Sequence, residues 1–393
     1  MNNIRSNLWK IYVYKLLSDF YLIIPIIIPF YKSNQLSTTE IFIVQSAYCL
    51  GVLLLEIPSG YFSDVMGRKK TLILGAFFLP IGLGIYAIST HFTGFILAEL
   101  ILSIANSMRS GTDSALIYDT LLQLKEDSLY EKFAGKADFF ARIGSSTASI
   151  TGGLLALVTI RFPFFINIIS GVVLVVLSFF LIEPERKKLS AENPLKDILK
   201  IVKFSLTHGQ IRSLMLYTSL LLSTGVIGVW SYFLYYETLG INVGFYGFLF
   251  ALFQLWCGLG AKNSHTLSKK IGKKNSIFVL LSISFIYMAL GLIQSIFLIP
   301  FIFLIGFLWN FSGPLLFGYL NRIIESDIRA TVLSVNNMAG NISFIILSPL
   351  FGTLVDVYSL STAHIAMAIY FFVIGSLAVF LLFKNKVIQA SRG

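Results

Sequence analysis

The sequence predicts an all-helical membrane protein with twelve transmembrane helices in two pseudo-symmetric six-helix bundles. Composition, the spacing of apolar runs and the distribution of basic residues each support this fold class. The chain has 393 residues, of which 56% are hydrophobic, and its mean hydropathy is +0.81. That composition leaves too little polar surface to cover two or three water-soluble domains, so most of the chain must face lipid or its own interior.

Apolar runs of membrane-spanning length follow one another along the chain. A helix needs about 20 apolar residues to cross a hydrocarbon core of about 30 Å. Helix is favoured over a β-barrel because these runs lack the short alternating pattern of membrane strands. The first run contains Asp19 and is too long for a signal peptide, so we expect it in the mature protein. The twelve predicted spans are 10–31, 39–60, 71–90, 94–122, 133–158, 162–183, 209–236, 242–261, 275–294, 296–320, 330–358 and 361–383.

The basic residues indicate the topology. The formal net charge is +11, and 25 of the 30 Lys and Arg residues fall in cytoplasmic segments if the N-terminus is cytoplasmic and the spans alternate. This positive-inside bias places both termini in the cytoplasm. Nucleic-acid binding is not expected, because the positive charges are dispersed over many connections and do not form one patch. Cys49 and Cys257 lie within spans, so no disulfide is expected.

The longest polar stretch lies near the middle of the chain. It predicts a cytoplasmic linker at 184–208 between two bundles, at 1–183 and 209–393. Two parallel six-helix repeats are a known transporter plan, in which the substrate site lies at mid-depth where the halves meet.

Related motifs recur at similar offsets in the two halves. Gly67-Arg68-Lys69-Lys70 returns 205 residues later as Gly272-Lys273-Lys274, and Ser110-Gly111 returns 202 residues later as Ser312-Gly313. Offsets that agree within three residues over half the chain support an internal repeat.

Ionisable residues at membrane depth are the first functional candidates. Burying one in a span costs at least ~2.5 kcal/mol on insertion scales. Asp19 lies about halfway along the first span. The span at 94–122 contains Glu99 near its outer end, Arg109 near its middle and Asp113 one turn further along.

Two of these charges have an alternative, purely structural explanation. Arg109 and Asp113 are four residues apart, as are Asp138 and Arg142. Each pair is able to neutralise itself along one face of its own helix.

Aromatic and amide side chains are the candidates in the C-terminal half. Trp230, Trp309 and Asn310 lie within spans that carry almost no charge. They suit a bulky, partly apolar ligand or a cation. The alternative is that the tryptophans only pack or anchor the protein at the membrane interface.

The stretch from Gly60 to Lys70 resembles the signature loop of the major facilitator superfamily, Gly-x-x-x-Asp-x-x-Gly-Arg-Lys-Lys. The matching residues are Gly60, Asp64, Gly67, Arg68, Lys69 and Lys70. The ends of spans 4 and 11 also resemble that family, so the resemblance covers the whole chain. Residues 56–60, with the motifs in span 4, are similar to a bacterial branch of efflux-like members. The resemblance implies a multi-pass protein of the bacterial inner membrane.

The resemblance also implies a role for this loop. In the family, the Asp and Arg of the loop pair with an acid at the cytoplasmic end of span 4, which is Asp119 here. Such a cluster would latch the halves shut on the inner side. From the residues themselves, we expect Gly60 and Gly67 to allow a sharp turn and Asp64 to meet Arg68 one helical turn away. A solvated loop that only sets orientation is the alternative.

The resemblance further implies that spans 1, 4, 7 and 10 line a central cavity. Asp19 and Arg109 would then face it at similar depth, with Asp19 as the leading proton carrier. We expect a proton-coupled exporter of small amphipathic or drug-like compounds. The alternative is a transporter of an anionic metabolite such as a carboxylate siderophore, suggested by the arginine at mid-depth. Glu99 stands where drug-exporting branches usually carry Arg, and Ala148-Ser149 where they carry Gly-Pro, so uptake stays open.

Two other classes have less support in the sequence. No nucleotide-binding fingerprint is present, and the four histidines lack metalloenzyme spacing, so neither an ATP-driven pump nor a membrane enzyme is predicted. A receptor that binds without moving cargo is not distinguished from a carrier. We expect a monomer without cofactor or metal, whose partners are a small-molecule substrate, protons and membrane lipids.

Overall fold

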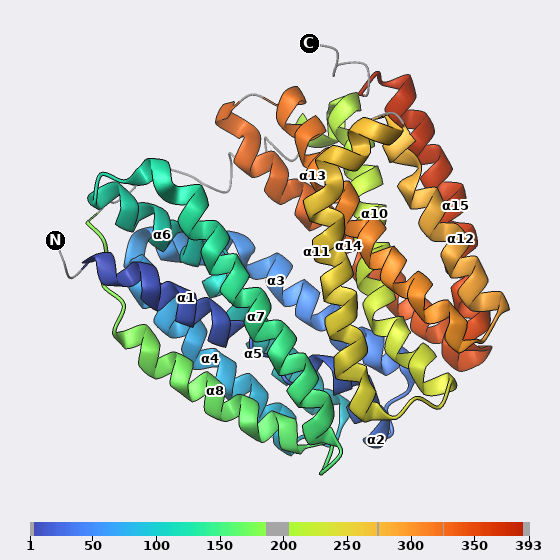
Figure 1. Ribbon diagram of the computed structural model, residues 1–393, viewed down its shortest axis with the longest axis horizontal. Coiled ribbons are helices and arrows are strands. Elements are labelled where there is room, and N and C mark those ends of the chain that lie inside the picture. The colour runs from blue at the N-terminus through green and yellow to red at the C-terminus, as the bar shows by residue number, and fades with distance from the viewer. Residues whose placement is uncertain (1–3, 186–203, 273–274, 325, 388–393) are drawn as a thin grey trace. The chain divides into compact units, whose positions relative to one another are not determined.

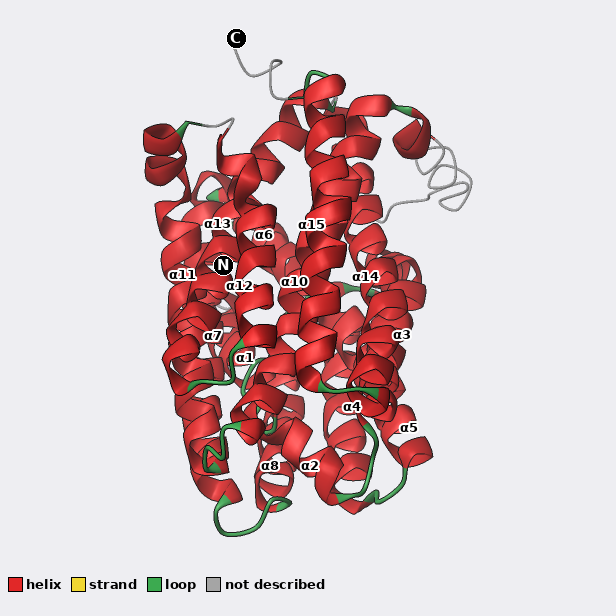
Figure 2. Cartoon of the chain, turned by 90° about the vertical axis from the view of Figure 1, so that its right-hand side faces the viewer, coloured by secondary structure: helices red, strands yellow, loops and turns green. Residues whose placement is uncertain are grey.

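The computed structural model describes residues 4–185, 204–272, 275–324 and 326–387. These residues form helices and connecting loops, without a strand among them (Figure 2). Most of the expected linker at 184–208 lies outside the described residues. The prediction of an all-helical membrane fold is therefore confirmed over the described part of the chain.

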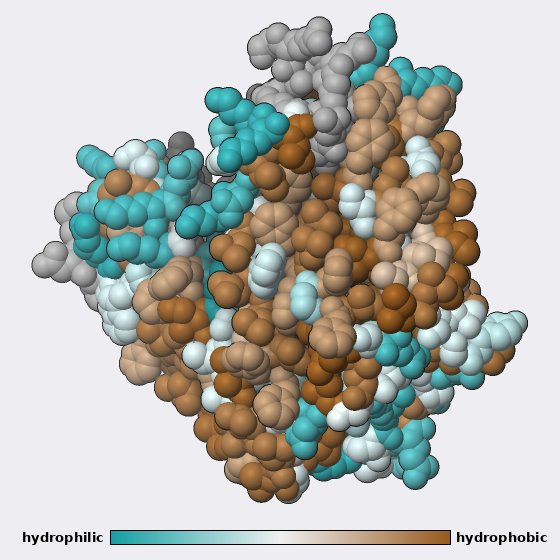
Figure 3. All heavy atoms as spheres, turned by 45° about the vertical axis from the view of Figure 1, so that its right-hand side comes forward, coloured by the Kyte–Doolittle hydropathy of each residue, from teal (hydrophilic) through white to brown (hydrophobic). Residues whose placement is uncertain are grey.

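Nine helices in the described residues are long and apolar enough to cross a membrane. The remaining predicted spans include a shorter apolar helix, Val279–Leu292, and a long helix that carries several charges, Tyr130–Ala156. The first predicted span is divided into two shorter helices. The count of twelve therefore stays a prediction. Apolar side chains cover most of the face shown in Figure 3, as expected of a surface in contact with lipid.

The chain divides into two compact units. Unit 1 comprises Met1–Leu36, Ala47–Ser190 and Asn242–Ala251, and unit 2 comprises Ser37–Ser46, Ala191–Ile241 and Leu252–Gly393. Two long helices, α3 and α11, contribute residues to both units.

Unit 1 is built around α4, which packs against both α5 and α8, while α1 packs against α7 (Figure 1). Glycines permit the close approaches: a Cβ at Gly144 of α7 would lie 2.3 Å from the carbonyl oxygen of Leu16 in α1. The helices of unit 1 are α1 (Asn7–Ser18), α2 (Ile27–Ser33), most of α3 (Thr38–Met66), α4 (Arg68–Ile88), α5 (Phe92–Arg109), α6 (Thr112–Gln123), α7 (Tyr130–Ala156) and α8 (Phe162–Phe179).

Unit 2 has a comparable core, in which α10 packs against α13, α14 and α15, and α12 packs against α15. Its helices are α10 (Gly209–Thr238), most of α11 (Tyr246–Ile271), α12 (Val279–Leu292), α13 (Ile299–Ile323), α14 (Ser326–Val357) and α15 (Leu360–Lys384).

The first turns of α3 belong to unit 2 because α14 caps them. The carboxylate of Asp356 accepts hydrogen bonds from the backbone N–H groups of Thr38 and Thr39, at 2.9 and 2.7 Å. Two turns further along α3, the hydroxyls of Ser46 and Ser348 lie 2.8 Å apart. A carboxylate at a helix N-terminus satisfies otherwise unpaired donors and interacts favourably with the helix dipole.

Candidate functional site

The first predicted span is not one helix. Helix α1 ends at Ser18 with Asp19 as its C-cap, and α2 begins at Ile27 after a 3-10 turn that contains Pro25. The prediction of a continuous helix over 10–31 is therefore wrong. Asp19 lies at the break and not in the middle of a helix. Pro25 lies at the start of this 3-10 turn, where its missing N–H group costs no intrahelical hydrogen bond.

Asn167 of α8 satisfies the backbone that this break exposes. Its side-chain oxygen accepts from the N–H of Leu22 at 2.8 Å, and its amide nitrogen donates to the carbonyl of Phe20 at 2.5 Å. Asn167 is buried. Irregular backbone at membrane depth is tolerated when other protein groups satisfy it in this way.

The fourth predicted span is also broken. Helix α5 ends at Arg109, α6 begins at Thr112, and Gly111 between them has a φ of 75°. Glycine adopts this left-handed conformation at little cost. The predicted span at 94–122 is found at Phe92–Gln123, but it is interrupted at Ser110-Gly111 and is not one continuous helix. Arg109 lies in the last turn of α5, where its charge complements the helix dipole.

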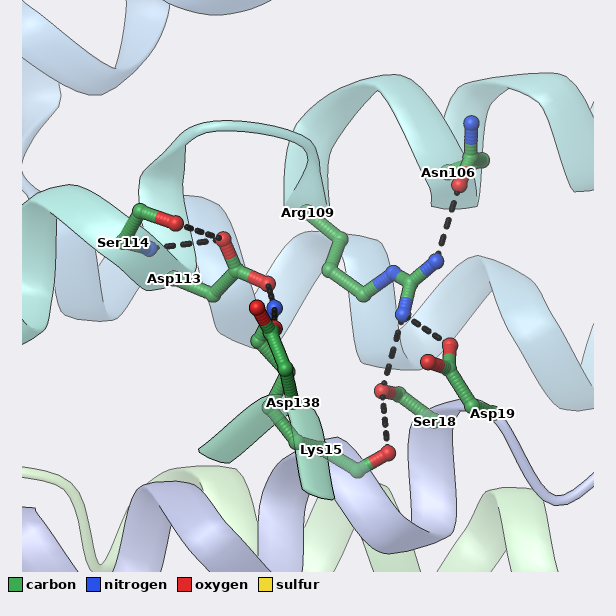
Figure 4. Close-up of polar contacts among 8 residues, drawn as sticks. All are labelled: Lys15, Ser18, Asp19, Asn106, Arg109, Asp113, Ser114 and Asp138. Atoms are coloured by element: carbon green, nitrogen blue, oxygen red, sulfur yellow. Dashed lines mark hydrogen bonds and ion pairs between the residues drawn. The ribbon is translucent and has the colours of Figure 1, made fainter. Parts of the chain in front are cut away.

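The two breaks bring Asp19 and Arg109 together (Figure 4). The guanidinium of Arg109 forms an ion pair with the carboxylate of Asp19 and donates to the hydroxyl of Ser18 at 3.0 Å and the amide oxygen of Asn106 at 3.0 Å. The side chains of Arg109 and Asp19 are 21% and 31% exposed. The two charges are thus partly buried, paired and supported by neutral hydrogen-bond acceptors.

A second ion-pair group lies beside the first and is centred on Lys15. The ammonium group of Lys15 lies 2.9 Å from Asp113 of α6 and 3.2 Å from Asp138 of α7. Among the described residues, Arg109 pairs with Asp19 and not with Asp113, so the expected pairing within one helix is not formed. The break at Gly111 takes the two side chains off a shared helix face.

The expected pair Asp138–Arg142 is not formed either, because Lys15 of α1 takes the carboxylate of Asp138. The side chain of Asp138 is 67% exposed, whereas those of Asp113 and Lys15 are 7% and 14% exposed. Sequence reasoning assigned Lys15 only to the cytoplasmic basic residues. Its position four residues before Asp19, in the last turn of α1, is the signal that would have identified it.

Glu99 lies in a separate buried cluster. One of its carboxylate oxygens accepts from the hydroxyl of Tyr86 at 2.5 Å and from that of Tyr31 at 3.4 Å, and the two tyrosine hydroxyls are hydrogen-bonded to each other. Glu99 is 7% exposed. The cluster joins α5 to α4 and α2, and the structure does not bring Glu99 into the ion pairs around Arg109.

The motif from Gly60 to Lys70 forms a tighter turn than predicted. Helix α3 continues to Met66 and α4 starts at Arg68, so only Gly67, with a φ of 113°, separates them. Gly60 lies inside α3 and needs no unusual backbone conformation, which corrects its expected role in the turn.

The structure brings together the three charged side chains expected around this turn. Arg68 lies 2.6 Å from Asp64 and 3.1 Å from Asp119 of α6, and it also bonds the hydroxyl of Ser63. Sequence reasoning missed Glu183, whose carboxylate accepts from the backbone N–H groups of Arg68 and Lys69 at 2.8 and 2.7 Å. Glu183 thereby caps α4 from a position 115 residues away.

The candidate residues of unit 2 lie on α10 and α13. The ring of Trp309 packs against Gly225, where an added Cβ would lie 2.2 Å from the ring. Asn310 donates within its own helix to the carbonyl of Gly306 at 3.1 Å, and Trp230 lies beside Phe233. Trp309 therefore has a packing role, and no described contact gathers these three side chains into one site.

Spanning helices interrupted at paired charges define a multi-pass membrane protein built around buried ionic groups. Residues 16–346 match the Major Facilitator Superfamily, and the chain belongs to this family of transporters.

Two of the relatives that match this chain differ in how much of it they cover, one about half and the other most of it. It is 26% identical over 194 residues to multidrug resistance protein 2 of Bacillus subtilis, a match that spans 47% of this chain and 46% of that protein. It is 23% identical over 372 residues to the uncharacterized MFS-type transporter YxaM of the same organism, covering 88% of each chain.

Solved structures show the same fold at low sequence identity. A mutant of the nucleoside transporter NupG has a TM-score of 0.82 at 15% identity, covering 98% of this chain and 100% of that one. A D-xylose-proton symporter has a TM-score of 0.72 at 15% identity, covering 98% and 97%. The chain therefore has the major facilitator fold.

Proposed function

We propose that the protein is a proton-coupled exporter of small amphipathic or drug-like compounds that works by alternating access. The observation that carries the proposal is the ion pair of Asp19 and Arg109 where two helices of unit 1 break. Broken helices at membrane depth are typical of substrate and ion sites in transporters. Protonation of Asp19 removes its negative charge and leaves Arg109 without its partner, which couples proton binding to a rearrangement of the site.

Partial similarity to a multidrug resistance protein supports the cargo class. The charged residues around Asp19 and Arg109 also support this cargo class. Asp19, Asp113 and Asp138 supply three acids against the two bases Arg109 and Lys15, and the side chain of Asp138 is largely exposed. This excess of one negative charge favours a cationic compound or a proton.

The alternative cargo, an anionic metabolite such as a carboxylate siderophore, was suggested by the arginine at mid-depth. Arg109 already directs its guanidinium at Asp19, Ser18 and Asn106. An anion would have to displace this carboxylate, so the contacts of Arg109 favour the cationic cargo.

We propose a gating role for the cluster of Asp64, Arg68 and Asp119. Its contacts hold the turn between α3 and α4 against α6. Loss of these bonds would release α3 and α4 to tilt, consistent with a latch on the cytoplasmic side.

The test uses purified protein in proteoliposomes under an imposed pH gradient. Ethidium and tetraphenylphosphonium serve as cationic probes, and citrate serves as the anionic probe. We expect movement of a cationic probe against its gradient, with a pH dependence that Asp19→Asn abolishes. Transport of citrate alone, or an unchanged pH dependence in Asp19→Asn, would refute the proposal. Asp127→Asn, which changes an exposed carboxylate, is the matched control.

A further inference from the structure

We propose that Glu99 is a second proton-holding site of unit 1, in addition to Asp19. The proposal deepens the proposed function, on which it rests, by assigning the proton to a residue other than Asp19 in one step of the cycle.

The hydrogen-bond partners of Glu99 suit a carboxyl group that changes its protonation state. Tyr86 and Tyr31 approach the same carboxylate oxygen, at 2.5 and 3.4 Å. A phenol hydroxyl both donates and accepts. It therefore donates to the carboxylate when Glu99 is ionised and accepts from the carboxylic acid when Glu99 is protonated, without movement of a helix.

Arg109, the partner of Asp19, cannot accept a hydrogen bond from a protonated carboxyl group. A guanidinium only donates hydrogen bonds and keeps its positive charge, so Arg109 stabilises only the ionised form of Asp19. While this ion pair is intact, Glu99 is the carboxyl group whose described partners fit its protonated form as well as its ionised form. The two carboxyl groups are thus suited to different steps of a transport cycle.

The surroundings of Glu99 are apolar and aromatic. The rings of Phe30, Phe95 and Phe164 pack around Tyr31 and Tyr86. Arg161 is a charged residue near these rings, with its guanidinium 5.2 Å from the centre of the Phe30 ring and bonded to the carbonyls of Ala87 and Ser89. A buried carboxyl group in such surroundings is costly to ionise unless hydroxyl groups support it.

A small cavity lies beside Arg109. It has a volume of about 10 Å³ and is lined by Ser18, Tyr21, Asn106 and Arg109, among others. That volume is about the space of a single water molecule, and the lining offers polar partners for one. Residues from both helix breaks and Tyr21 thus surround a position where a hydroxyl or a water molecule can carry a proton.

The proton transfer is balanced without any other reactant. Glu99 gives up its proton and becomes a carboxylate, and Asp19 gains a proton and becomes a neutral acid. A hydroxyl or water molecule that relays the proton takes up one proton and releases its own, so it is unchanged at the end. The neutral Asp19 then no longer compensates the charge of Arg109, which is the event that the proposed function requires.

The experiment combines infrared spectroscopy with two transport assays on the full chain. Glu99→Gln keeps an oxygen that accepts from Tyr86 but cannot bind the proton. We expect the infrared difference spectrum of Glu99→Gln, taken between acid and alkaline buffer, to lack one carbonyl band of a carboxylic acid. We also expect transport of tetraphenylphosphonium driven by a pH gradient to fall at least tenfold, while counterflow of the same probe, which needs no net proton movement, continues.

Three further variants keep the test decisive. Glu99→Asp restores a titrating group and should recover the band, Tyr86→Phe should shift the pH at which the band appears, and Asp127→Asn should change neither. A spectrum of Glu99→Gln identical to that of the unaltered protein would overturn the proposal, as would its full retention of gradient-driven transport. If the unaltered protein moves no cationic probe, the proposed cargo fails, and the infrared comparison still decides the role of Glu99.

Discussion

Two segments that the sequence relates by an offset of 202 residues differ in structure. The helix that carries Arg109 stops at Ser110-Gly111 and restarts as α6, whereas α13 continues without a break across Ser312-Gly313. Gly111 has a left-handed backbone, and Gly313 is not among the described glycines with positive φ. A shared dipeptide has therefore produced a break in one unit and a regular helix in the other.

The flanking residues explain the difference. Arg109 ends α5 and Asp113 lies in the first turn of α6, so both charges are favourable at the helix termini that the break creates. Phe311 and Leu315 occupy the positions 202 residues later, and neither side chain stabilises a helix terminus. The comparison indicates that unit 1 has its charges where its helices end, and that unit 2 keeps neutral side chains within continuous helices.

The largest expected effect comes from separating the charges of unit 1. Asp19→Asn or Arg109→Gln leaves a partly buried charge without its partner, and we expect each to lower the free energy of unfolding by about 3–5 kcal/mol. The double variant should recover most of this loss, because it removes both charges. Chemical or thermal unfolding in detergent measures these differences as a double-mutant cycle.

A neutral pair in unit 2 is the control for this cycle. The hydroxyl of Thr218 in α10 is hydrogen-bonded to Asn336 of α14, and Thr218→Val should cost only about 1 kcal/mol. If breaking the neutral pair lowers the free energy of unfolding as much as breaking the pair of Asp19 and Arg109, the charges at the helix breaks contribute no more stability than an ordinary hydrogen bond.

Hydropathy and charge distribution predicted the helical membrane fold, and the family resemblance together with their similar depth predicted that Asp19 and Arg109 face the same region. The helix breaks were missed, although Ser110-Gly111-Thr112-Asp113 combines a C-terminal glycine with residues typical of a helix start. Asn167, Glu183 and Lys15 were missed as partners for a different reason. Their contacts join residues more than 90 positions apart, which no local pattern encodes.

The second comparison concerns Gly67 and Gly272, which follow α3 and α11 and have φ values of 113° and 85°. Asp64 precedes Gly67 and pairs with Arg68, whereas Lys269 stands at the equivalent position before Gly272. We expect Asp64→Asn to leave membrane insertion intact and to lower transport about tenfold, equivalent to about 1.4 kcal/mol, because Arg68 loses a charged partner.

Lys269→Gln is the matched variant in unit 2 and should transport normally. Transport of ethidium or tetraphenylphosphonium in proteoliposomes, compared at equal protein abundance, measures both variants. If Asp64→Asn retains the full rate, the cluster of Asp64, Arg68 and Asp119 has no role as a latch, and its charges only orient the loop.

A substitution of similarly small expected effect tests the backbone of the break itself. A Cβ at Gly111 would meet nothing within 4 Å, so Gly111→Ala isolates the cost of the left-handed conformation, about 1–2 kcal/mol. Gly313 is a poor control because it precedes Pro314, which disfavours a helical residue with a Cβ before it. Gly318 in the same helix also has no atom within 4 Å of an added Cβ, and Gly318→Ala should stabilise α13 by up to about 1 kcal/mol. Opposite signs in thermal unfolding would establish that the break at Gly111 is maintained by its backbone conformation, whereas two stabilising substitutions would show that α5 and α6 can join into one helix.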